Sequence, residues 1–194
     1  RSGGSPFWLE ALVRSGGGEV DAGRLVTARL RGAGADAGAL LALLAIAARP
    51  LELAAAAELN RWEGERAQQA ARELVGRGIA VESGGSLRLA HDLIRAAAAG
   101  EIPDDRRRDI HRRLADWLAE TAGVDVRRLR EAVGHRHAAG TPCLDLAARL
   151  VRSPQRTLLG QDGLRLVASI ADEVDPLDAE AFALHWEVAS LASE

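Results

Sequence analysis

The chain has 194 residues with 25 basic and 28 acidic side chains, and its formal net charge of −3 gives no general attraction to nucleic acid or anionic lipid. Apolar residues make up 47% of the sequence and aromatic residues only 3%, so the core must consist mainly of leucine, alanine, valine and isoleucine, which suits packed helices. There is one cysteine, Cys143, which excludes an internal disulfide.

The same features restrict the cellular compartment in which the protein is expected to reside. A lone cysteine favours the reducing cytoplasm, where we expect the protein to reside. The longest apolar run, Ala37 to Ala48, is shorter than the ~20 residues that a membrane-spanning helix needs, so we expect no membrane association.

The first half of the chain predicts a series of helices. Ser5-Pro6 fits a helix start, because a hydroxyl suits the N-cap and proline suits the first turn. Asp36 is expected to cap a segment that is apolar on every side and is therefore buried, and Pro50 to end it. A short helix is expected over residues 51–59 and a longer one over residues 63–77.

A β-hairpin is predicted after these helices. Alternating apolar positions in residues 79–81 and 87–89 flank the glycine-containing segment 82–86, which is a hairpin signal. Three helices followed by a hairpin is the order of a winged helix-turn-helix. The next helix is expected to open at His91-Asp92.

The second half predicts helices throughout. Residues 105–121 carry an apolar stripe at helical spacing, and 126–139 form the next helix. Later helices are expected to start at polar-proline pairs, namely Thr141-Pro142, Ser153-Pro154 and Asp175-Pro176. Short paired helices with short loops suggest antiparallel hairpins in a solenoid.

Several stretches occur in the order found in one known family. These are Gly4-Ser5-Pro6-Phe7-Trp8-Leu9-Glu10, Leu89-Ala90-His91-Asp92-Leu93-Ile94-Arg95, Arg106-Arg107-Arg108, the segment AVGHRHAAG over 132–140, and the helix pair over 163–193. Taken together they resemble the regulatory half of the STAND ATPases, most closely the large LuxR-type bacterial transcription regulators. The His91 segment also resembles the Met-His-Asp motif of the related plant and animal immune and apoptotic ATPases. Ala90 stands in place of the Met of that motif, and Ser5 in place of the Asn of the first motif.

The resemblance implies three parts and a function. Residues 1–35 would end the lid helices of a nucleotide domain, 36–100 would form a winged-helix domain, and 101–194 a TPR-like helical domain. The fold would therefore be mainly α, with a winged helix-turn-helix, one small β-hairpin and a TPR-like array. In the parent protein, His91 would sense the β-phosphate of bound ADP, and Pro6 would lie near the adenine.

The resemblance also implies partners. The winged helix would contact the parent's own nucleotide-binding domain, and the helical repeats would bind an unknown protein or small-molecule inducer. ADP or ATP would be the cofactor of the parent only, because a P-loop needs a lysine and this chain has none. We expect a non-catalytic regulatory module without enzymatic activity.

Plainer interpretations remain open. His91 at a helix start can make a local hydrogen bond, with Asp92 as the cap. The alternative function is a DNA-binding winged-helix repressor with a helical effector or dimerisation domain. Against it, Glu63 and Glu65 oppose the approach of phosphates on the third helix. His135 and His137 face different directions on a helix, so no shared metal is expected.

Overall fold

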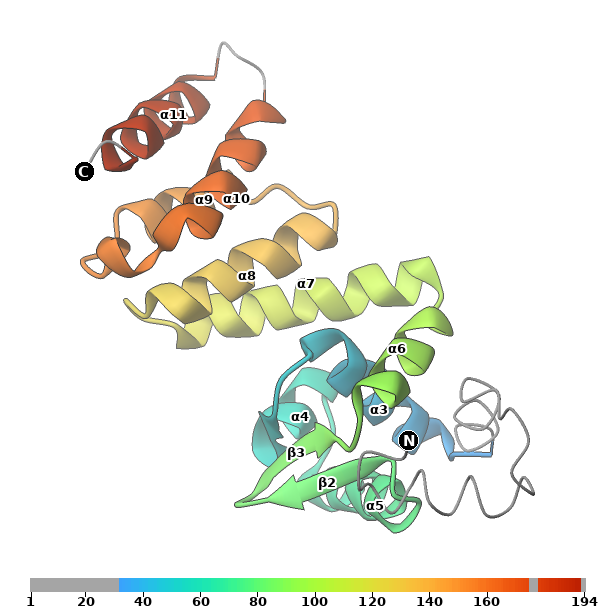
Figure 1. The fold of residues 1–194 in the computed structure, drawn as a ribbon. Coiled ribbons are helices and arrows are strands. Elements are labelled where there is room, and N and C mark those ends of the chain that lie inside the picture. Colours follow the sequence, from blue (N-terminus) through green and yellow to red (C-terminus); the bar gives the residue numbers. More distant parts are fainter. Residues whose placement is uncertain (1–31, 175–177, 193–194) are drawn as a thin grey trace, which may run out of the picture. The chain divides into compact units, whose positions relative to one another are not determined.

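The computed structural model describes residues 32–174 and 178–192, so Pro6 lies outside the described residues. The chain divides into two units, one up to Pro103 and the other from Asp104 onward. The described residues are mainly helical with one small antiparallel sheet, which confirms the mainly α expectation (Figure 1). No helix in this part of the chain combines the length and apolarity needed to cross a membrane.

The core of the first unit is built around α3, Ala35–Ala47. Its leucines Leu40, Leu43 and Leu44 are at most 1% exposed, as expected for a helix that is apolar on all sides. The helix ends at Ala47, and its C-cap Ala48, two residues before Pro50, has a left-handed φ of 54°. The expected capping role of Asp36 is wrong. Gly34 is the N-cap, and Asp36 lies in the first turn.

Two helices follow α3, and a short strand precedes them. They are α4, Leu53–Asn60, and α5, Gly64–Gly76. Helix α5 buries Ala67, Ala70, Ala71 and Leu74, as its spacing predicts. Val75, also expected on the inner side, is 37% exposed.

The sheet has three strands instead of the two of the predicted hairpin. Strands β2, Ala80–Ser83, and β3, Ser86–Leu89, pair through a turn at Gly84-Gly85. Both glycines have positive φ, 58° and 77°, which is the conformation that a two-residue hairpin turn requires. The additional strand β1, Leu51–Glu52, pairs with β3, so the order is β1-β3-β2.

Helix α6, Asp92–Gly100, begins directly after the hairpin. It contacts both α3 and β3, and its buried Ile94 and Ala98 face this core. The predicted helix opening at His91-Asp92 is thus confirmed.

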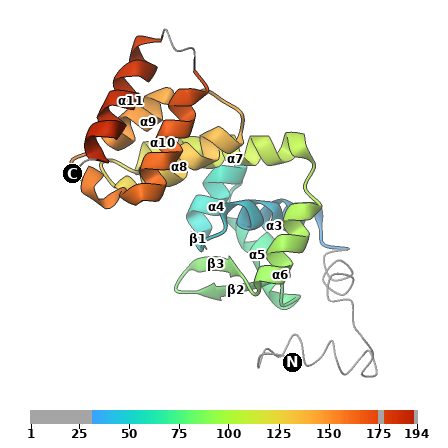
Figure 2. The same ribbon diagram turned by 45° about the horizontal axis from the view of Figure 1, so that its top comes forward.

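The second unit consists of helices joined by short connections. They are α7, Asp104–Thr121, α8, Val126–Ala138, α9, Leu144–Val151, the 3-10 turn η1, Arg156–Leu158, α10, Gly160–Asp172, and α11, Ala179–Leu191. Helices α7 and α8 lie side by side and antiparallel (Figure 2). A continuous apolar cluster runs from Leu118 on α7 to Leu184 on α11 and forms the core of this unit.

The polar-proline pairs predict helix starts poorly here. Helix α9 begins after Cys143, not at Thr141-Pro142. Ser153 opens a turn, because its hydroxyl donates to Val124 O and accepts from Gln155 N. The pair Asp175-Pro176 lies outside the described residues. Asp178 is the N-cap of α11, accepting from Glu180 N and Ala181 N at 2.8 and 3.0 Å.

Candidate functional site

His91 is the N-cap of α6. Its backbone is extended, with φ −155° and ψ 147°, and its Nδ1 accepts a hydrogen bond from Leu93 N at 3.2 Å. An imidazole that accepts at Nδ1 carries its proton on Nε2 when it is neutral, so Nε2 is then a donor. Asp92, the cap in the plainer interpretation, is instead the first residue of α6, and its carboxylate pairs with Arg95 at 3.3 Å.

A cavity of about 190 Å³ lies beside this cap. It is formed by the end of α3, the strand β3 and the start of α6, so residues distant in the sequence converge on it. The lining residues are Leu44, Ala48, Arg49, Pro50, Arg88, Leu89, His91, Asp92 and Arg95. The cavity therefore joins an apolar floor to a cationic rim.

The charge around this cavity favours an anion. Three guanidinium groups, of Arg49, Arg88 and Arg95, line it together with a single carboxylate, that of Asp92. The Asp92 side chain is 89% exposed, so its ion pair with Arg95 is weak and replaceable. The N-terminus of α6 adds the partial positive charge of the helix dipole. A phosphate group suits this set of donors.

Helix α5 holds Arg66 in internal contacts, whereas its other arginine, Arg72, is exposed. Arg66 donates to both carboxylate oxygens of Asp36 at 2.8 and 2.6 Å, and its guanidinium lies 5.2 Å from the centre of the Trp62 ring. The hydrogen bond from Arg66 holds the pKa of Asp36 below its usual value. Arg77 pairs with Glu73 at 3.0 Å. A helix that reads DNA uses such side chains for phosphates and bases.

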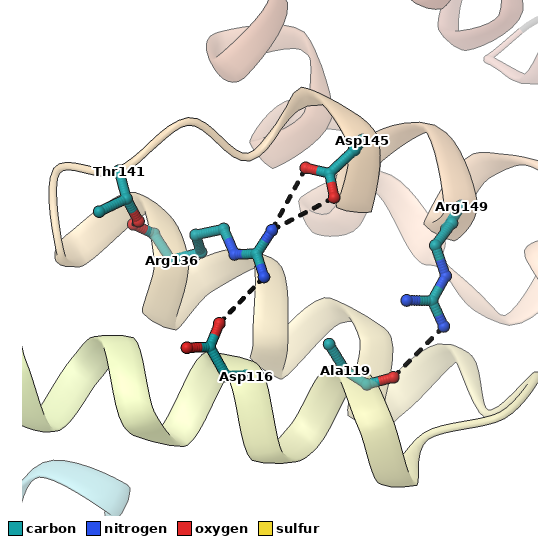
Figure 3. A network of polar contacts seen from close by, with 6 residues as sticks. All are labelled: Asp116, Ala119, Arg136, Thr141, Asp145 and Arg149. Atoms are coloured by element: carbon teal, nitrogen blue, oxygen red, sulfur yellow. Dashed lines mark hydrogen bonds and ion pairs between the residues drawn. The ribbon is translucent and has the colours of Figure 1, made fainter.

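Arginines also organise the second unit. Figure 3 shows Arg136 of α8 between Asp116 of α7, at 3.0 Å, and Asp145 of α9, at 3.2 Å. Arg149 of α9 donates to Ala119 O of α7 at 3.3 Å. These contacts tie three successive helices together, so they act in packing.

The structure brings together two histidines that the sequence did not pair. His111 on α7 and His135 on α8 have their Nδ1 atoms 2.8 Å apart. Burial, aided by the charge of Arg107, lowers the pKa of His111. The pair is 24 residues apart in the sequence, and only the predicted antiparallel hairpin of the two helices hints at their contact.

The remaining histidines and the cysteine are separate from each other. His137 Nδ1 lies 3.5 Å from Glu173 Oε2, and His185 Nε2 lies 2.8 Å from Asp172 Oδ1. Cys143 is buried, and this burial raises the pKa of its thiol. Within residues 32–174 and 178–192, no group of three or more histidine, cysteine or acidic side chains is placed to hold a metal ion.

Comparison with known proteins gives no match: no family model, curated protein or solved structure is similar enough to this chain to place it in a family.

Proposed function

We propose that this chain is a non-catalytic regulatory and interaction module of a nucleotide-switched STAND-type transcription regulator. The observation that carries the proposal is the position of His91, which caps α6 and lines a cationic cavity. The order of α3, α4, α5 and the hairpin supports a winged-helix interpretation of the first unit, and the helix pairs of the second support a TPR-like one.

The role proposed for His91 uses both ring nitrogens. The hydrogen bond from Leu93 N to Nδ1 fixes the ring on α6 and leaves the proton of the neutral ring on Nε2. Capping and phosphate sensing are therefore compatible, whereas the sequence presented them as alternatives. Bound ADP would supply an anionic phosphate as the acceptor for this donor and for the arginines of the cavity rim.

The switch is a shift between two populations. With ADP bound to the parent's nucleotide domain, contacts at the His91 cavity favour docking of the winged helix on that domain. A signal at the helical repeats, or exchange for ATP, favours release. Such a shift requires each ligand to bind one of the two states more tightly than the other.

The test uses the full-length protein that contains this chain, with His91→Ala and His91→Ser compared to wild type. Serine keeps an N-cap acceptor but lacks the ring, so it separates capping from sensing. Each protein is denatured as purified, and the released ADP and ATP are quantified by chromatography. We expect ADP in the wild type and its loss, or replacement by ATP, in both variants.

Stability provides the matched control. We expect His91→Ala to lower the free energy of unfolding by about 1 kcal/mol and His91→Ser to lower it much less. If His91→Ser retains ADP as the wild type does, His91 acts only as a cap and the sensor role is wrong. If even the wild type carries no nucleotide, the family assignment itself fails.

A further inference from the structure

Helix α11 presents two large aromatic side chains to solvent. Phe182 is 70% exposed and Trp186 is 72% exposed. They are four residues apart, so they lie on the same side of the helix. Exposed aromatic residues close together are typical of surfaces that bind other proteins, because such rings contribute much of the energy of an interface.

A cavity of about 280 Å³ adjoins Phe182. Its apolar lining comes from both helices of the hairpin, through Ala171, Val174 and Ala181. Asp172 and His185 stand at the same cavity, hydrogen-bonded to each other at 2.8 Å. The surface thus offers an apolar recess that an aliphatic side chain can fill, next to the aromatic pair.

The charge of this hairpin is strongly acidic. Residues 160–174 and 178–192 carry six carboxylates against a single guanidinium, that of Arg165. The carboxylates are Asp162, Asp172, Glu173, Asp178, Glu180 and Glu187. Glu187 is paired with Arg152 at 3.0 Å, so the excess of negative charge at this surface is smaller by one. A partner with basic residues beside its apolar ones is complementary to this surface.

Two of these carboxylates stand where they are unfavourable for the helix itself. Asp172 is the last residue of α10 and Glu173 is its C-cap, at the end where the helix dipole is already negative. The hydrogen bond from His185 to Asp172 raises the pKa of His185, as a negative environment does. A cationic partner would offset this accumulated negative charge.

We infer that the α10–α11 hairpin binds a basic amphipathic helix of a partner protein. Its apolar side chains would pack on Phe182 and Trp186 and enter the recess, and its arginines or lysines would meet the carboxylates. A second copy of the chain fits less well, because a symmetric contact would place this acidic surface against itself. The inference rests on the interaction role proposed above for the helical half, but not on the nucleotide switch.

The test measures binding of fluorescein-labelled helical peptides to the whole chain by fluorescence anisotropy. The probe is a leucine–arginine peptide of about five helical turns, with leucines at i, i+3, i+4 and i+7. One control has the same composition with leucines spread around the helix, and another has glutamate in place of arginine. We expect the probe to bind more tightly than either control, and more weakly at higher salt.

The matched variants distinguish binding at the aromatic pair from non-specific hydrophobic binding of the peptide. We expect the Phe182→Ala/Trp186→Ala double variant to raise the Kd of the probe by about tenfold or more. Leu158→Ala removes another exposed apolar side chain of the same unit, 63% exposed, and should leave the Kd unchanged. Because both changed sites are exposed, far-UV circular dichroism should show the wild-type fold in each variant.

Two results would overturn the inference. One is a double variant that binds the probe as tightly as wild type. The other is a wild-type dimer in sedimentation that the double variant dissociates, since the occupant is then a second copy. The assay needs no nucleotide, so failure of the ADP experiment and failure of this one are distinguishable.

Discussion

At the residue scale, arginine side chains make several of the long-range polar contacts. Arg66 reaches Asp36, Arg136 reaches Asp116, and Arg152 reaches Glu187 at 3.0 Å, 35 residues further along the chain. The chain has no lysine, so each such contact is made by a planar guanidinium with several fixed donors. One arginine can therefore hold two carboxylates, as Arg136 does.

We predict that Arg136→Lys destabilises the chain. The Arg136 side chain is 20% exposed and serves two carboxylates, whereas an ammonium cannot keep both geometries. Urea unfolding should show a loss of about 1 to 2 kcal/mol. The control is Arg165→Lys, whose pair with Asp162 is 77% exposed on both sides and should change stability by less than about 0.5 kcal/mol. Equal effects of the two variants would contradict the bridging role.

The contact of His111 with His135 predicts that the free energy of unfolding depends on pH. The lowered pKa of His111 means that the folded state binds fewer protons than the unfolded state below about pH 6.5. Its contribution to stability is therefore lost as the pH falls through about 6.5 toward the lowered pKa. His111→Asn keeps a polar group that cannot be protonated. It should lose less stability than wild type between about pH 7.5 and about pH 5 in urea unfolding.

His185 serves as a control, because its pKa is shifted in the opposite direction to that of His111. Its hydrogen bond to Asp172 raises its pKa, so its contribution is present below about pH 6.5 and is lost as the pH rises through the raised pKa. His185→Asn should therefore lose more stability on acidification than wild type. The His111 interpretation fails if His111→Asn keeps the full wild-type pH dependence.

At the scale of elements, α3 is the central helix of the core of the first unit. Its apolar residues contact α4, α5, α6 and strand β3, so this one helix packs against elements from most of the unit. Leu43 is 0% exposed. Its removal leaves a cavity that neighbours on several elements would have to fill.

We predict that Leu43→Ala lowers the free energy of unfolding by about 2 to 5 kcal/mol. Thermal or urea unfolding followed by circular dichroism measures this loss. Leu93→Ala is the matched control, because Leu93 belongs to α6 of the same unit and is 43% exposed. We expect it to cost much less, and a similar cost for both variants would show that α3 is not the central core helix.

The elements predicted correctly from the sequence are those whose formation depends on residues close together in the chain. The apolar run of α3 and the Gly84-Gly85 turn each carry their signal within a few residues, and both were predicted. Strand β1 was missed because its two residues show no alternation and depend on pairing with Leu87, 36 positions later in the chain. Local capping chemistry likewise misassigned Asp36, whose partner Arg66 is 30 residues away.

In the candidate site, too, the local features were predicted from the sequence and the long-range ones were not. His91 at the start of α6 was found because a helix start is a local feature. The cavity beside it depends on Arg49 and Arg88, which only the fold brings to His91. The exposed pair on α11 was likewise not predicted, because the sequence alone does not distinguish an aromatic side chain in the core from one on the surface.

For the whole molecule, the distribution of charge favours the proposed function over the DNA-binding alternative. The net charge is −3, and the hairpin carries Glu82 on β2 and only one basic residue, Arg88 on β3. On α5 the guanidinium of Arg66 is already held by a carboxylate. A DNA reader needs cations that can replace the counterions of several phosphates.

We therefore predict no salt-dependent binding of the chain to duplex DNA. Fluorescence anisotropy with a labelled duplex at low and physiological salt measures this directly. Asp36→Asn, which releases Arg66 from its ion pair, is the informative variant, because it tests whether that pairing suppresses an affinity for phosphate. Tight binding by wild type that weakens steeply with salt would favour the winged-helix repressor instead.

Cys143, buried at the N-cap of α9, has one more consequence. The thiolate is the reactive form of cysteine, and burial raises the pKa of this thiol, so labelling reagents can react with it only when the start of α9 opens. Because Cys143 is the sole cysteine, each modification event reports an opening at this one place. The rate at which a thiol-reactive dye modifies Cys143 therefore measures how often this part of the second unit opens, without an engineered label.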